Sequence, residues 1–211
     1  MRSNRSRLAL LGVLALALSV TVGPAVADAK RVTRTATGGA VPDAVDILGG
    51  PTVEGAAVPI EFKLKGKKVK KRQVADVDIQ IAGAANAEGA AADLRYKLVS
   101  PNGDSVNWGV FIPFGITSFD VKWDNKSQLF ACNPLFLQAS DCLYATGATP
   151  ANPGLGSLVG ELDGGFLKNT FRINNPKGSW TLDVWDTFAG GITTLGNVSL
   201  TVNAIKKFAK E

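Results

Sequence analysis

The stretch Gly178-Ser179-Trp180-Thr181-Leu182-Asp183-Val184-Trp185-Asp186 alternates apolar and polar side chains. A second alternating run, Leu-Gly-Asn-Val-Ser-Leu-Thr-Val over 195–202, follows after Phe188-Ala189-Gly190-Gly191. A period of two places every other side chain on one face of a β-strand, so each run predicts a strand with one buried face. The short glycine-bearing connection predicts that the two strands pair as a β-hairpin.

The same period recurs earlier in the chain. The inward faces that it predicts are Val77, Ile79 and Ile81; Leu94, Tyr96 and Leu98; and Phe119, Val121 and Trp123. Ser100-Pro101-Asn102-Gly103-Asp104 supplies turn chemistry after the second of these runs. No apolar stripe of helical period follows the N-terminal region. Short strands separated by turns predict an all-β fold, an antiparallel, jelly-roll-like β-sandwich.

The N-terminus has the features of a secretory signal peptide. Arg2, Arg5 and Arg7 precede an uncharged run over 8–22, and Ala25-Val26-Ala27 places small residues where a signal peptidase cuts. The run is shorter than the roughly 20 apolar residues that a membrane-spanning helix needs. We therefore expect residues 1–27 to be removed, and the product to be secreted into the extracellular space without a transmembrane anchor.

The remaining residues suffice for one sizeable core. Residues 28–57 lack sustained periodicity and predict an irregular leader that either is flexible or lays one strand along the domain. The compact domain is expected over 58–204, followed by a polar tail over 205–211. We expect this product to be a monomer.

Signal removal weakens any argument from net charge, because three of the 23 basic residues and none of the 18 acidic ones leave, so that +5 becomes +2. What remains is a local basic run: Lys63, Lys65, Lys67, Lys68, Lys70, Lys71 and Arg72. Such a run could bind a polyanion, form a solvated edge strand or expose a proteolytic site. It contains no aromatic residue that could stack on a base, so no nucleic-acid partner is expected.

Cys132 and Cys142 are the only cysteines. In an oxidising compartment a closely spaced pair predicts one structural disulfide. The chain has no histidine, so two cysteines make a poor zinc site, and no Cys-x-x-Cys motif suggests redox chemistry.

These motifs together carry a resemblance. Val77 to Ile81, Asp93-Leu94, Ser100-Pro101-Asn102-Gly103, and Gly178-x-Trp180-x-Leu182-x-Val184-x-Asp186 resemble the P domain (Homo B domain) over about 67–204. That family is a jelly-roll β-sandwich that follows the catalytic domain of subtilisin-like proprotein convertases and bacterial exoproteases. This chain departs from it by lacking a histidine near Ala82 and a tryptophan at Val198, and by the inserted cysteine loop.

The resemblance implies a stand-alone module that packs on a partner such as an extracellular protease; an envelope component is the alternative partner. It does not imply catalysis here, because a Ser-His-Asp triad needs a histidine as general base. Paired carboxylates could hydrolyse glycosides, and the candidates are Glu161 with Asp163 and Asp183 with Asp186. Solvated loop and outward strand positions explain these acids better, so no catalytic residue is expected.

Metal and sugar sites are the remaining alternatives. Oxygen ligands from Asp93, Asp104 and Asp186 could hold calcium, but no Asp-x-Asp-x-Asp-Gly loop is present, and no cofactor is predicted. Trp123 and Trp180 share faces with core residues, which leaves Trp108 and Trp185 as candidate aromatic ligand platforms. The leading interpretation is a secreted, non-catalytic protein-interaction or stabilising module, and the alternative is a carbohydrate or cell-envelope binding module.

Overall fold

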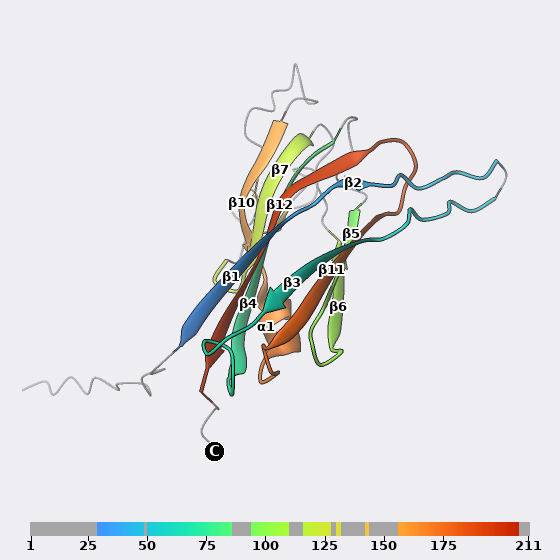
Figure 1. The fold of residues 1–211 in the computed structure, drawn as a ribbon. Helices are drawn as coiled ribbons and strands as arrows, with labels where there is room; N and C mark the ends of the chain where they lie inside the picture. Colours follow the sequence, from blue (N-terminus) through green and yellow to red (C-terminus); the bar gives the residue numbers. More distant parts are fainter. Residues whose placement is uncertain are drawn as a thin grey trace, which may run out of the picture.

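The computed structural model describes residues 29–48, 50–85, 94–109, 116–127, 130–131, 142–143 and 156–206. Within these ranges two sheets pack face to face as a β-sandwich (Figure 1). The larger sheet has the order β1 (Lys30–Thr37), β12 (Thr193–Ile205), β4 (Gln73–Ala85), β7 (Ile116–Asp124), β10 (Gly156–Asp163), and β2 (Ala40–Val41) also pairs with β12. The smaller sheet has the order β3 (Val58–Leu64), β11 (Gly178–Asp186), β5 (Leu94–Val99), β6 (Ser105–Gly109).

The core lies between the sheets and contains the inward faces predicted from the sequence. All nine apolar residues predicted on β4, β5 and β7 are buried, as is Trp180 on β11. The predicted turn after β5 is present, with Gly103 at φ +91° and a backbone hydrogen bond of 2.8 Å from Ser100 N to Asp104 O. The all-β sandwich predicted from alternation is therefore confirmed.

The predicted hairpin between the last two runs is wrong. β11 pairs with β3 and β5 in the smaller sheet, whereas β12 pairs with β1, β2 and β4 in the larger one. The glycine-bearing segment after Asp186 therefore carries the chain from one layer to the other. Alternation fixes which face of a strand is buried, but it does not select the hydrogen-bonding neighbours, and two strands facing each other across a core bury their apolar sides equally well.

The expectation of a purely antiparallel arrangement is also wrong. β10 runs parallel to β7, with Leu162 opposite Trp123, and β8 (Phe130–Ala131) runs parallel to β9 (Cys142–Leu143). β10 lies in a region rich in glycine and proline, and the sequence pattern predicted no place for it at the edge of the sheet. The remaining strand pairs of the two described sheets are antiparallel.

The leader is more ordered than an irregular segment. All eight residues of β1 pair with β12, from Lys30 opposite Ala204 to Thr37 opposite Asn197. The prediction of an irregular leader is wrong for β1 and β2, and the alternative, a strand laid along the domain, is confirmed. Only Val32 of β1 is buried, so the strand has too few apolar positions to produce a period-two signal.

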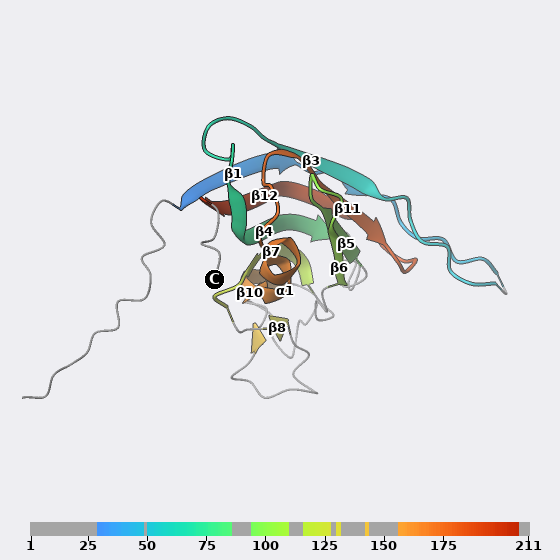
Figure 2. The same cartoon turned by 90° about the horizontal axis from the view of Figure 1, so that it is seen from below.

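One short helix, α1 (Gly165–Phe171), lies between β4 and β6 at one end of the sandwich (Figure 2). Its buried residues are Leu167 and Phe171, and the Phe171 ring packs edge-on against Trp180 with centroids 5.1 Å apart. Seven residues are too few to show a helical stripe in the sequence. In the part of the chain described, no helix is long and apolar enough to cross a membrane.

Candidate functional site

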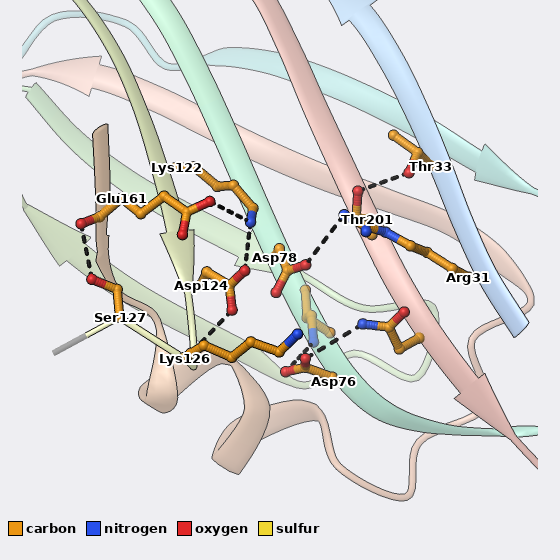
Figure 3. Close-up of polar contacts among 12 residues, drawn as sticks. Arg31, Thr33, Asp76, Asp78, Lys122, Asp124, Lys126, Ser127, Glu161 and Thr201 are labelled. Atoms are coloured by element: carbon orange, nitrogen blue, oxygen red, sulfur yellow. Dashed lines mark hydrogen bonds and ion pairs between the residues drawn. The ribbon is translucent and has the colours of Figure 1, made fainter. Parts of the chain in front are cut away.

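The outer face of the larger sheet carries a continuous polar surface. Strand register places the polar residues in cross-strand rows: Thr33 with Thr201 and Asp78; Thr35 with Ser199, Gln80, Lys122 and Glu161; and Arg31 with Asn203 and Asp76. Paired hydroxyls join β1 to β12, with oxygens 2.8 Å apart in both Thr33–Thr201 and Thr35–Ser199. β1, β12, β4, β7 and β10 thus contribute to one surface, and Figure 3 shows polar contacts within it.

A pocket of about 160 Å³ opens on this surface. Its lining residues are Arg31, Thr33, Asp78, Gln80, Lys122, Ser199 and Thr201. Asp78 is only 4% exposed, and its Oδ1 has no hydrogen-bond partner in the described structure. Its Oδ2 lies 4.0 Å from Arg31 Nη2, which is too long for a hydrogen bond. The pocket therefore contains a poorly satisfied carboxyl group.

Burial, together with the nearby carboxylates of Asp76 and Asp124, raises the pKa of Asp78 to about 6 against the opposing effect of Lys122 and Arg31. Asp76 also has a raised pKa, because burial outweighs its hydrogen bond from Asn203 Nδ2 at 3.4 Å. Two neighbouring carboxyls on β4 thus resist ionisation, which is the behaviour expected of acids that share a partly desolvated surface.

Lys122 joins β7 to β10. Its ammonium donates to Asp124 and, at 2.9 Å, to Glu161 Oε1. Burial would lower the pKa of Lys122, but these two hydrogen bonds raise it, so the side chain is a cation. Burial would likewise raise the pKa of Asp124, but hydrogen bonds from Lys122 and from the Lys126 amide lower it. This cluster is a satisfied ion-pair network at the edge of the pocket.

A second candidate surface is an arm that projects from the sandwich between β2 and β3 (Figure 1). Val45 and Val53 exchange two backbone hydrogen bonds of 2.9 Å, which hold its two limbs together. The arm exposes Val45, Ile47, Leu48 and Val53, and the neighbouring β11–β12 connection exposes Phe188 and Ile192. At the base Gly55 N donates to Asp186 O at 2.9 Å, and Gly190 N lies 3.3 Å from the Asp43 carboxylate.

The two candidate tryptophans do not form one platform. Trp108 on β6 faces the core, where its ring stacks on Tyr96 and contacts Trp123 and Phe166. Trp185 occupies the opposite face of the same sheet, because it alternates with the buried Val184 and Asp186. Trp108 is therefore a partly buried residue packed against the core, which disfavours it as a ligand platform, and a ligand role for Trp185 stays a prediction.

The proposed calcium ligands are not brought together either. Asp186 lies opposite Leu94 at the start of β5, whereas Asp104 follows the other end of that strand and accepts a 2.7 Å hydrogen bond from Asn174. At 3.4 Å per residue these ends are about 17 Å apart. Asp93 lies outside the described residues. Among those described, no three Asp, Glu, His or Cys side chains form a group that could hold a metal ion.

The acidic pairs considered for hydrolysis have other roles. Asp183 and Asp186 point to opposite faces of β11, since Asp186 is buried and Asp183 is not. Glu161 pairs with Lys122, and Asp163 accepts a hydrogen bond of 2.8 Å from the Gly165 amide at the start of α1. Asp183 and Asp186 are thus too poorly oriented to act together, and both members of the other pair have structural partners.

The basic run is divided between two elements. Lys63 lies on β3, an edge strand of the smaller sheet, as the edge-strand interpretation predicts. The remaining residues form the connection from β3 to β4, in which Lys67, Lys68, Lys70 and Lys71 are exposed and Arg72 is half-buried. Val69 is buried beneath them. Polyanion binding and proteolysis at this connection stay predictions.

The predicted disulfide falls only partly on the described residues. Cys142 begins β9 and pairs in register with Phe130 of β8, but Cys132 lies outside the described ranges. The predicted signal peptide over 1–27 and residues 207–211 of the polar tail also lie outside them. The bond and the cleavage stay predictions.

Sequence reasoning missed the pocket on the larger sheet. The alternation that predicts Val77, Ile79 and Ile81 as inward leaves Asp76, Asp78 and Gln80 on the outward face, but it gives no reason to connect them with Arg31 or Lys122. The available signal was the polar residues at the outward positions of β4, β7 and β12. Only the order of the strands in the sheet shows that these residues lie side by side. No family model matches this chain, and no curated protein is significantly similar to it.

Proposed function

We propose that this chain is a secreted, non-catalytic interaction module that binds another extracellular protein through its projecting arm. The exposed apolar side chains of the arm are the observation that carries the proposal. Large apolar residues gathered on one exposed element characterise protein-binding surfaces more than ordinary surface positions. Ile47 and Leu48 lie nearest the arm's tip, where a binding partner can reach them, and Leu48 is fully exposed.

The arm is anchored well enough to present this surface. Asp46 accepts a side-chain hydrogen bond of 2.7 Å from Thr52, and Gly50 N donates to Ile47 O at 2.8 Å. These contacts, with the Val45–Val53 pair, reduce the ordering entropy that a partner would otherwise have to offset on binding. Phe188 and Ile192 extend the apolar surface from the arm towards the sandwich.

The partner class comes from the P-domain resemblance. A P-domain-like jelly roll would act by packing on a subtilisin-like protease, and the absence of any histidine in this sequence argues against a Ser-His-Asp triad within it. We therefore propose an extracellular protease as the partner, with the arm as the contact element.

The test compares the double variant Ile47→Asp/Leu48→Asp with wild type. The control is Ile173→Asp, which changes an exposed apolar residue outside the arm; Ile173 is 60% exposed, compared with 51% for Ile47. Each protein is used to capture partners from the source organism's secreted proteins, and the captured protein is purified and titrated by calorimetry. Wild type and the control should bind one secreted protease, and the arm variant should bind it at least tenfold more weakly. Equal binding by all three would refute the arm, and a non-protease partner would refute the protease assignment.

A further inference from the structure

We infer that the pocket around Asp78 is a second binding site, separate from the arm, for a neutral, hydroxyl-rich ligand such as a single sugar unit of a glycan. The pocket has a buried polar group at its floor. Asp78 is 4% exposed, and Oδ1 accepts no hydrogen bond from the described residues. A buried carboxyl group without partners costs free energy that a donor from a ligand would recover.

The surrounding charges select against ions of either sign. Arg31 and Lys122 border the pocket and oppose a cationic ligand. Asp76, Asp78 and Asp124 interact electrostatically with one another in the same region and oppose an anionic ligand. A neutral ligand that both donates and accepts hydrogen bonds avoids both penalties.

The available hydrogen-bonding groups match vicinal hydroxyls. Thr33 and Thr201 both line the pocket, and because one O–H is used between them, the other remains free to donate. Lys122 has three N–H donors and uses two, on Asp124 and Glu161. Gln80 donates its amide to Asp120 Oδ1 at 2.7 Å, which leaves its carbonyl oxygen as an acceptor.

The pocket has a size suited to one ring. Its volume of about 160 Å³ corresponds to roughly five water molecules at about 30 Å³ each. None of its lining residues is aromatic, so recognition would rest on hydrogen bonds rather than on ring stacking. This chemistry differs from a tryptophan platform, and it involves neither Trp108 nor Trp185.

The experiment follows backbone amide NMR shifts of the secreted chain while neutral sugars are added. The panel is glucose, galactose, mannose and N-acetylglucosamine, with glucuronate and glucosamine as charged probes. We expect at least one neutral sugar to shift amides of β1, β4, β7 and β12 at millimolar concentration, and the charged probes to bind at least fivefold more weakly. Shifts confined to other elements, no shifts at all, or stronger binding of a charged probe would overturn the inference.

Variants separate this site from general effects on folding. Asp78→Asn keeps the shape of the side chain and should weaken sugar binding at least tenfold, and Gln80→Leu should do so independently. The matched control is Asp183→Asn, a carboxylate on the outer face of the other sheet, which should bind as wild type does. Unchanged affinity in both pocket variants would refute the site. Ile47→Asp/Leu48→Asp should leave sugar binding intact, so failure of the arm proposal would not affect this one.

Discussion

The rings of Tyr96 and Trp108 stack across β5 and β6, with centroids 5.5 Å apart and planes inclined by 25°. Trp123 from the larger sheet lies 5.7 Å from the first ring and 5.9 Å from the second. Aromatic contacts therefore connect the two layers of the sandwich at this end. The Trp108 side chain, which the sequence offered as a candidate for ligand stacking, instead contributes to packing between the two sheets.

Trp108→Ala should lower the free energy of unfolding by about 3 kcal/mol, the usual cost of removing a large ring from a packed cluster. Trp185→Ala removes the same atoms from the outer face and should cost at least about 1 kcal/mol less, since that side lacks the described aromatic cluster. Urea denaturation followed by fluorescence measures both. Equal losses would contradict the assignment of Trp108 to the core.

Asp78 should make stability depend on pH. Its pKa of about 6 in the folded protein exceeds the ordinary 3.8, so the folded state binds the proton more tightly than the unfolded state. This contribution therefore lowers stability as pH rises from about 4 through 6, and the full penalty persists above that range. Asp78→Asn removes it, and the gain over wild type should be larger at pH 7.5 than at pH 4.5 by on the order of 2 kcal/mol.

The pH comparison is made as a difference between the two proteins because other groups titrate nearby. Asp76 has a raised pKa and Asp124 a lowered one, so their contributions run in opposite directions. Both remain in the variant and largely cancel. Chemical denaturation of both proteins at the two pH values is the measurement, and a difference that does not change with pH would disprove the assignment.

Lys122→Met should destabilise the larger sheet by about 2 kcal/mol, because it leaves Asp124, which is 7% exposed, without its ammonium partner. Lys126→Met is the matched control. That side chain is exposed and Asp124 uses only its backbone amide, so the expected cost is below about 0.5 kcal/mol. Thermal unfolding followed by circular dichroism compares them, and similar melting temperatures would show that the ion pairs contribute little.

Removing the chain before Val58 should destabilise the domain strongly. The truncation deletes β1 and β2, exposes one edge of β12 and uncovers the apolar contacts of Val32 and Val41. An exposed central strand is a template for pairing with other chains, so aggregation should accompany the loss. Size-exclusion chromatography, for association, and thermal unfolding, for stability, compare residues 58–211 with residues 28–211. If the truncated chain is a monomer with an unchanged melting temperature, β1 and β2 are not part of the stable domain, and the domain begins near Val58.

The sequence was sufficient for the sandwich because burial follows alternation directly. Val77, Leu98 and Trp180 could each be assigned to the core from their immediate neighbours in the chain. The pairing of the strands could not be predicted in this way, because Trp180 and Val198 lie on equally alternating runs and yet belong to different sheets. β1 escaped notice because an edge strand with a single buried valine has no periodic signal.

The pocket was beyond sequence reasoning for the same cause. Thr33, Asp78 and Thr201 are adjacent only because β12 is inserted between β1 and β4. The apolar residues of the arm can be identified in the sequence, but their exposure cannot. It depends on how the arm projects from the sandwich. Local sequence patterns therefore predict which face of a strand is buried, whereas the residues that form a surface site depend on the register between strands that are distant in the sequence.

The place of β12 also bears on the order in which this molecule is made. The last of the described strands, β12, is inserted between β1 and β4, so the growing chain cannot complete its larger sheet until about residue 205 has been synthesised. Contacts that span so much sequence are slow to form, because loop-closure entropy must be lost before they stabilise anything. A growing chain that has not yet reached β12 therefore has β1 and β4 without the strand that joins them.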